Sequence, residues 1–200
     1  MHILFFLEEP SAEAFLRGVL PKLLSNDTTW EMIVFQGKRD LLKNLEPRLK
    51  AYRHWIPEDR RIVVLIDEDR QNCLELKRRL DLAAANAGFM TKSASPDGRF
   101  VVLNRIAVEE LEAWFLGDPI ALAAAFPGVP STLGAKAAYR NPDAIAGGTW
   151  EVLQRVLQRA GYYGGGIAKI EIAGKMAAHM EPTRNASRSF TCFAEGLAAL

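Results

Sequence analysis

The segment Arg61–Ile66 (Arg-Ile-Val-Val-Leu-Ile) constrains the fold more than any other part of the chain. It is rich in β-branched side chains and shows no alternation of apolar and polar residues. This pattern is typical of a strand that is buried on both faces of a parallel sheet. Because parallel strands need crossover connections, usually helices, the segment predicts an α/β fold.

Strand and helix patterns alternate along the first 120 residues. The predicted strands are 3–7, 31–35, 61–66 and 100–104. Helical spacing of apolar residues predicts helices over 11–20, with Ser11 as N-cap, over 41–49, interrupted by Pro47, and over 73–87, ended by Gly88. These repeated units predict an open, mainly parallel sheet with helices on both faces, as in Rossmann-like folds.

The rest of the chain predicts helices outside this core. A helix over 108–116 would place Glu109 and Glu112 on one surface, three residues apart. Shorter helical patterns follow after Asp118-Pro119 and over 150–160, 167–180 and the last residues, around a proline- and glycine-rich stretch at 127–148. We expect one domain over 1–200, with a core of about 1–120 and a helical extension of about 120–200.

Composition excludes several classes of protein. With 200 residues, 49% hydrophobic and 24% charged, the chain does not have the composition of a disordered protein, a collagen or a coiled coil. A net charge of +1 excludes the strong basic field that alone would indicate nucleic-acid binding, so the overall charge does not indicate any class of partner. Cys73 and Cys192 lack metal-ligand spacing, and no signal peptide or run of ~20 apolar residues is present, so we expect a cytoplasmic protein without a membrane segment.

Acidic residues follow two predicted strands. Glu9 follows the first strand, and Asp67 and Asp69 follow the third. The carboxyl ends of parallel strands meet at one sheet edge, where such folds place ligands. Converging carboxylates raise one another's pKa at a cost in free energy unless a cation neutralises them, and Mg²⁺ prefers such oxygen ligands. The pattern therefore favours a magnesium site, and two ions would clamp the attacking and leaving oxygens of a phosphodiester.

Each of these features also has a structural explanation. Acidic residues after strands cap helices and face water, so only their co-location favours a metal. The most plausible phosphate contacts are Lys169, Arg184 and Arg188, with hydroxyl donors Ser187 and Ser189, although the same residues suit a solvated polar strip. The glycine run 164–166 suits either a phosphate cradle or a turn. No phosphate-loop motif occurs.

Three segments together resemble the domain-of-unknown-function 4276 family, a TOPRIM-like group. They are Phe6–Glu13 (Phe-Leu-Glu-Glu-Pro-Ser-Ala-Glu), the strand end Asp67-Glu68-Asp69, and Glu109–Trp114 (Glu-Glu-Leu-Glu-Ala-Trp). The resemblance extends over nearly the whole chain and includes the tail 185–190. TOPRIM domains are the magnesium-binding catalytic folds of topoisomerases, primases and OLD-type nucleases.

The resemblance implies roles for individual residues. Glu9, Asp67 and Asp69 match the glutamate and the Asp-x-Asp pair that hold metal. Glu13 matches the second acid of the Glu-Gly-x-x-Glu form, although Pro10 stands in place of the glycine, and Glu112 matches the acid on the helix after the fourth strand. Glu13 and Glu112 would then hold a second metal or orient water. Independently of the resemblance, we expect Lys169 to be the cation that stabilises the transition state.

We therefore expect a Mg²⁺- or Mn²⁺-dependent phosphodiester hydrolase that acts on nucleic acid, with DNA as the favoured substrate. The family resemblance implies a role in phage defence or on mobile elements, with a separate ABC-type ATPase as partner. A homo-oligomer is also compatible with the sequence. The alternative is a non-catalytic interaction subunit of an ATPase complex. A receiver-like signalling domain ranks last, because it would need no Asp69 and only ~120 residues.

Overall fold

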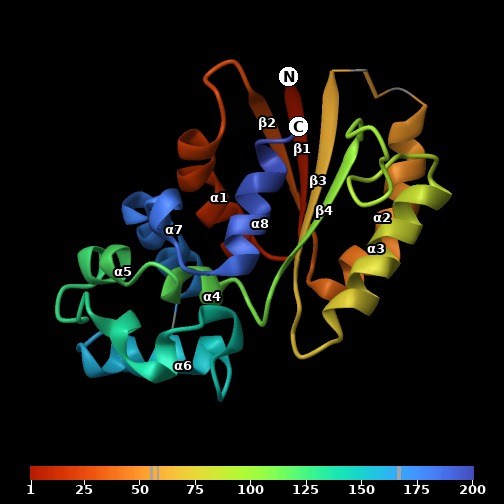
Figure 1. The fold of residues 1–200 in the computed structure, drawn as a ribbon. Helices are drawn as coiled ribbons and strands as arrows, with labels where there is room; N and C mark the ends of the chain where they lie inside the picture. Colours follow the sequence, from red (N-terminus) through yellow and green to blue (C-terminus); the bar gives the residue numbers. More distant parts are fainter. Residues whose placement is uncertain (55, 58, 166–167) are drawn as a thin grey trace.

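One parallel sheet organises the molecule (Figure 1). The computed structural model describes residues 1–54, 56–57, 59–165 and 168–200. The strands are β1 (His2–Leu7), β2 (Thr29–Val34), β3 (Arg60–Asp67) and β4 (Val102–Ala107). They pair in the order β2-β1-β3-β4, and every pairing is parallel. The predicted α/β class with an open parallel sheet is confirmed.

Helices cover both faces of the sheet. They are α1 (Pro10–Leu23), α2 (Lys38–Arg53), α3 (Cys73–Asn86), α4 (Glu112–Leu116), α5 (Pro119–Ala125), α6 (Thr149–Arg159), α7 (Lys169–His179) and α8 (Arg188–Leu197). Figure 1 shows α2 and α3 on one face, α1, α7 and α8 on the other, and α4, α5 and α6 beyond the carboxyl ends of the strands. In the described ranges, no helix has the length and apolar character needed to cross a bilayer.

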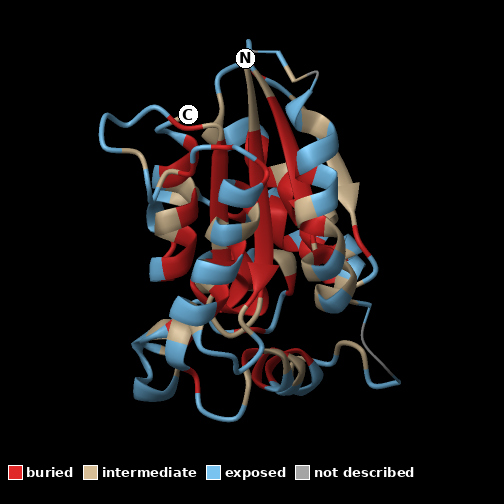
Figure 2. Cartoon of the chain, turned by 90° about the vertical axis from the view of Figure 1, so that its right-hand side faces the viewer, coloured by how far each residue is buried: buried red, intermediate tan, exposed pale blue. Residues whose placement is uncertain are grey.

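The central strands are buried on both sides, as Figure 2 shows by their red colour. Alternate residues of β3 enter two separate cores: Val63 and Leu65 pack on the side of α1, and Ile62, Val64 and Ile66 pack on the side of α2 and α3. This explains the absence of alternation in the sequence. Because side chains two apart in a strand share a face, Asp67 continues the α1 side after Leu65.

Three local predictions are wrong. The helix expected from Val108 begins only at Glu112, because Glu109 has a φ of 61°, in the left-handed region that a helix cannot contain. Glu109 and Glu112 therefore do not share a helix surface. Helix α1 begins at Pro10, with Glu9 rather than Ser11 as its N-cap. Helix α2 continues through Pro47.

Strand β4 is shifted from the predicted range 100–104, since it runs over Val102–Ala107. Its polar residues Asn104 and Arg105 both have partners within the fold. Asn104 Nδ2 donates to Asp81 Oδ1 at 2.8 Å, and Arg105 Nε donates to the carbonyl of Cys192 at 2.9 Å. A strand accommodates polar residues when neighbouring helices supply such partners.

Helix α7 brings part of the C-terminal extension against the core. At Gly18 of α1, an added Cβ would lie 2.7 Å from the Cβ of Ala177, so the two helices approach too closely for a larger residue. Lys22, near the end of α1, donates to the carbonyls of Ala177, Ala178 and Met180 at 2.8–3.0 Å. The two helices thus run in the same direction, and both begin at the carboxyl edge of the sheet.

Candidate functional site

Two carboxylates are buried at this edge. Asp67 ends β3, and Glu112 begins α4 with only 1% of its surface exposed. Burial raises the pKa of Asp67 well above its ordinary value, and the negative charges of Glu112, Glu8, Glu9 and Asp69 raise it further. Burial also raises the pKa of Glu112 to about 7, although Lys169 acts in the opposite direction. Groups with pKa values perturbed in this way are concentrated at functional sites.

Lys169 is the cation of this cluster. It is the first residue of α7, and its Nζ lies 3.8 Å from Glu112 Oε1 and 4.0 Å from Glu9 Oε2. The same ammonium lies 4.6 Å from the centre of the Trp150 ring. Burial lowers the pKa of Lys169, but the carboxylates around it, first Glu112 and then Glu9, outweigh this effect and raise it. Lys169 is therefore charged and partly neutralises the acids.

The neutralisation is incomplete. Within the described residues, Oε2 of Glu112 is a buried oxygen that has no hydrogen-bond partner. An unsatisfied buried acceptor costs about 1–3 kcal/mol, more when it is charged. Native structures contain few such atoms, and they often mark a place for water or an ion.

Glu9 is positioned by the start of α1. It is the N-cap residue, in extended conformation, and its carboxylate accepts a hydrogen bond from the Ser11 hydroxyl. The positive end of the α1 dipole favours a negative charge at this point. The structure brings Glu9 together with Asp67, as expected for two strand ends at one sheet edge, and with Glu112. The charge of Glu9 raises the pKa of both Asp67 and Glu112, and Glu9 shares Lys169 with Glu112.

Glu8 belongs to the same cluster, and the sequence prediction missed it. Its carboxylate accepts the backbone N–H of Asp67 at 3.0 Å, which joins the ends of β1 and β3. Burial raises its pKa to about 7. The sequence does contain a signal for Glu8, because two consecutive acids, Glu8 and Glu9, follow the first apolar strand. The prediction assigns only Glu9 to the site.

Asp69 lies at the border of the cluster. Its carboxylate forms an ion pair with Lys38 Nζ at 2.8 Å, and Lys38 also donates to the carbonyl of Glu68 at 2.9 Å. Asp69 and Arg70 have φ values of 49° and 62°, so the turn after β3 is in the left-handed region. The Asp-x-Asp motif therefore contributes one buried carboxylate, that of Asp67, and one that pairs with α2.

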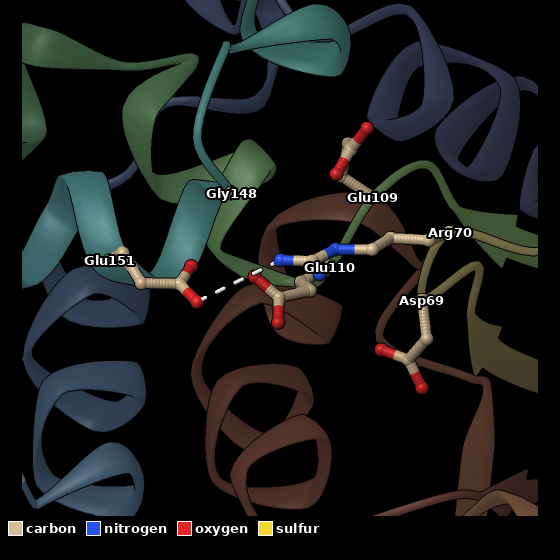
Figure 3. Close-up of a pocket in the computed structure, with 6 residues that line it drawn as sticks. All are labelled: Asp69, Arg70, Glu109, Glu110, Gly148 and Glu151. Carbon is tan, nitrogen blue, oxygen red and sulfur yellow. Dashed lines mark ion pairs between the residues drawn. The ribbon is translucent and has the colours of Figure 1, made fainter.

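A small acidic pocket adjoins this turn (Figure 3). It has a volume of about 130 Å³ and is lined by Asp69, Arg70, Glu109, Glu110, Gly148 and Glu151. Glu110 accepts hydrogen bonds from Thr149 Oγ1 at 2.9 Å and from the backbone N–H of Trp150 at 2.8 Å, so it fixes the start of α6. The excess of acids around Arg70 makes this pocket unfavourable for a phosphodiester without added cations.

Other predicted site residues have partners elsewhere. Glu13 forms an ion pair with Arg17 one turn further along α1, at 2.6 Å. Arg184 forms two hydrogen bonds of 2.8 Å with Asp118, which occupy the guanidinium in place of the expected phosphate contact. Arg188 is exposed, with Glu195 at 3.8 Å.

The hydroxyl donors expected to bind phosphate hold the fold together instead. Ser187 caps α8, and both Ser187 and Ser189 bind Asp143. Ser189 also accepts the indole N–H of Trp114 at 2.8 Å. In the glycine run, Gly166 lies outside the described residues, as does Ile167, the predicted first residue of the helix over 167–180.

The cluster fits a divalent cation in chemistry but not in its present spacing. Across 1–54, 56–57, 59–165 and 168–200, no three His, Cys, Asp or Glu side chains converge closely enough to hold a metal ion. The oxygens of Glu9, Asp67 and Glu112 are nevertheless the hard donors that Mg²⁺ prefers. Oε2 of Glu112 has no other partner. These three residues would hold the cation.

Comparison with known proteins identifies one family. Residues 7–198 match the family model described as "Domain of unknown function (DUF4276)". Comparison with the curated proteins and with the solved structures gives no match.

Proposed function

The chain belongs to the DUF4276 family, and we propose that it is a Mg²⁺- or Mn²⁺-dependent phosphodiester hydrolase that acts on nucleic acid. The observation that carries the proposal is the buried pair Asp67 and Glu112 at the carboxyl edge of the sheet, with Glu9 and Lys169 beside it. Proteins keep such poorly neutralised carboxylates mainly where a ligand uses them. The resemblance to TOPRIM domains of OLD-type nucleases supports the same reaction class.

In this proposal each residue has a separate task. Glu9, Asp67 and Glu112 would hold the cation, and Glu112, whose pKa is raised to about 7, would release a proton to do so. When bound, Mg²⁺ neutralises the carboxylates and polarises a phosphoryl oxygen. Lys169 donates N–H groups to a phosphate oxygen. Glu13 is given no role here, because Arg17 binds its carboxylate at 2.6 Å, whereas Lys169 lies 3.8–4.0 Å from Glu112 and Glu9.

The test is cleavage of supercoiled plasmid, linear DNA and RNA by the full chain with Mg²⁺, Mn²⁺ or EDTA. We expect cleavage with either metal and none with EDTA. Asp67→Asn should reduce it by at least about 100-fold, since even groups that only support a metal ligand cost 10–100-fold when they are replaced. The matched control is Asp97→Asn, in an exposed turn, which should cleave like the wild type. Cleavage that survives both EDTA and Asp67→Asn would contradict the proposal.

A second candidate is a non-catalytic subunit that binds an ABC-type ATPase. The observation in its favour is that Lys169 already pairs with both Glu9 and Glu112, so these acids have a partner without any metal. This function predicts no cleavage and no Mg²⁺ binding, and Asp67→Asn would leave copurification with the ATPase unchanged. Copurification also tests whether a second copy of the chain is a partner.

A further inference from the structure

We propose that Lys169 is an exchangeable cation of the site, which a divalent metal displaces from between Glu9 and Glu112 when it binds. The inference rests on the metal dependence proposed above, but not on cleavage. It concerns how the site is neutralised when no metal is present, and it makes the C-terminal extension part of metal binding.

The ion pairs of Lys169 are long. Its Nζ is 3.8 Å from Glu112 and 4.0 Å from Glu9, whereas a charge-assisted N–H···O hydrogen bond is about 2.7–2.9 Å. The ammonium is therefore held by charge attraction without tight hydrogen bonds. Its side chain is 35% exposed, but that of Glu112 is 1% exposed. Lys169 has a route to solvent, and Glu112 does not.

The cluster needs more positive charge than Lys169 supplies. The ammonium of Lys169 acts on the carboxylates of Glu112, Glu9 and Asp67, and Oε2 of Glu112 has no hydrogen-bond partner among the described residues. A divalent ion brings twice the charge and several coordination positions to the same oxygens. Exchange of Lys169 for the metal therefore improves the neutralisation of the buried acids.

Trp150 gives Lys169 a second contact and provides a reporter. Its ring centre lies 4.6 Å from Nζ, a favourable cation–π distance. The backbone of Trp150 is held by Glu110, which accepts its N–H at 2.8 Å. This bond holds the Trp150 backbone at the start of α6, and the side chain of Lys169 is 35% exposed. Departure of the ammonium from the ring should change the fluorescence of this tryptophan.

The first experiment compares metal affinity in Lys169→Met and the wild type by calorimetric titration with Mg²⁺ and Mn²⁺. Removing the competing ammonium should tighten binding by about tenfold, equivalent to 1.4 kcal/mol. The matched control is Lys175→Met on the same helix, whose ammonium pairs with the exposed Glu171 at 2.7 Å. Its metal affinity should equal that of the wild type. Equal or weaker binding by Lys169→Met would overturn the inference.

The second experiment uses the wild-type chain and does not depend on the folding of a variant. Titration with Mg²⁺ should change the tryptophan emission at the concentrations at which calorimetry shows binding. The chain has four tryptophans, so Trp150→Phe assigns the signal, and it should lose the change. Binding without any change in Trp150 emission would show that Lys169 stays in place, and would overturn the inference.

The outcomes separate this inference from the proposed function. Metal binding that is no tighter in Lys169→Met overturns the exchange but leaves hydrolysis intact. Tighter binding by Lys169→Met, with no cleavage of nucleic acid by the wild type, supports the exchange and contradicts the hydrolase. If neither the wild type nor Lys169→Met binds Mg²⁺ or Mn²⁺, both the exchange of Lys169 and the proposed hydrolase function are wrong.

Discussion

Asp118 and Glu112 are buried to the same extent but have opposite surroundings. Their exposed fractions are 0% and 1%. Asp118 accepts four hydrogen bonds, from the backbone N–H groups of Ala121 and Glu181 and from two nitrogens of Arg184. Burial raises the pKa of Asp118, but these donors outweigh it and keep the pKa below its ordinary value. For Glu112 the structure gives an ion pair with Lys169 at 3.8 Å, and the pKa of Glu112 rises to about 7.

The difference shows that burial alone does not identify a functional carboxylate. What distinguishes the two is the supply of donors. Asp118 has its full set of partners and joins α5 to the segment before α8, as expected for a structural ion pair. Glu112 retains an unused oxygen. The comparison predicts that substitutions at the two sites change stability in opposite directions.

The largest effect is expected for Asp118→Ala. It removes four hydrogen bonds and leaves Arg184 unpaired, and breaking a buried pair costs about 3–5 kcal/mol. Because Arg184 is 36% exposed and is rehydrated, we expect the lower end of that range. Urea unfolding measures the loss, with Asp97→Ala as an exposed control. If the free energy of unfolding fell by less than about 1 kcal/mol, the Asp118–Arg184 pair would not be an important structural contact.

Glu112→Gln should have the opposite sign. Above neutral pH and without metal, the wild type must keep an ionised Glu112 in a buried position, and glutamine removes that cost. A shift from 4.5 to about 7 corresponds to a gain of up to about 3 kcal/mol, at about 1.4 kcal/mol per pKa unit. Chemical unfolding in EDTA measures it. Destabilisation by Glu112→Gln would mean that its pairing with Lys169 outweighs the cost of burial.

The pH dependence of stability follows from the same values. Between pH 4.5 and about 7, folded Glu112 and Glu8 keep protons that the unfolded chain has released. The folded state therefore binds more protons, and the free energy of unfolding falls as pH rises through this interval. Melting temperatures in EDTA should show this decline, and Glu112→Gln should make it shallower. Asp118 acts in the opposite direction, because its contribution is lost only as pH falls below its ordinary pKa.

The smallest effect on stability is expected for Arg188→Ala. Its side chain is 73% exposed, and its pairing with Glu195 at 3.8 Å is worth at most about 0.5 kcal/mol. If Arg188 contacts phosphate, the variant should instead lower the slope of DNA affinity against salt by about one. Binding at several salt concentrations measures this slope. An unchanged slope and affinity would exclude the contact.

The sequence predicts the fold class and places Asp67 at the carboxyl edge of the sheet. Because β3 is buried on both faces, the segment Arg61–Ile66 lacks alternation of apolar and polar residues, and this pattern can be read from the sequence. Asp67 follows directly after this segment. The left-handed conformation of Glu109 could not be read from the sequence in this way, since its backbone N–H donates to the side chain of Glu68, 41 residues away. Asp118 and Arg184 are distant in sequence and meet only after the helices have packed. The sequence predicts Lys169 as a cation of the site. Its position beside Glu9 depends on the packing of α7 against α1, which the sequence pattern does not predict.

The contact between Gly18 and Ala177 brings α1 and α7 close together and also determines how far the two helices are shifted relative to each other along their axes. With a rise of about 1.5 Å per residue, Gly18 lies about 13 Å along α1 from Glu9. A larger side chain at Gly18 would push α7 aside or slide it along its axis, and Lys169 would move with the helix. A glycine about 13 Å from Glu9 along α1 thus determines the position of the Lys169 ammonium, and substitutions at this helix crossing would alter the site without changing any of its own residues.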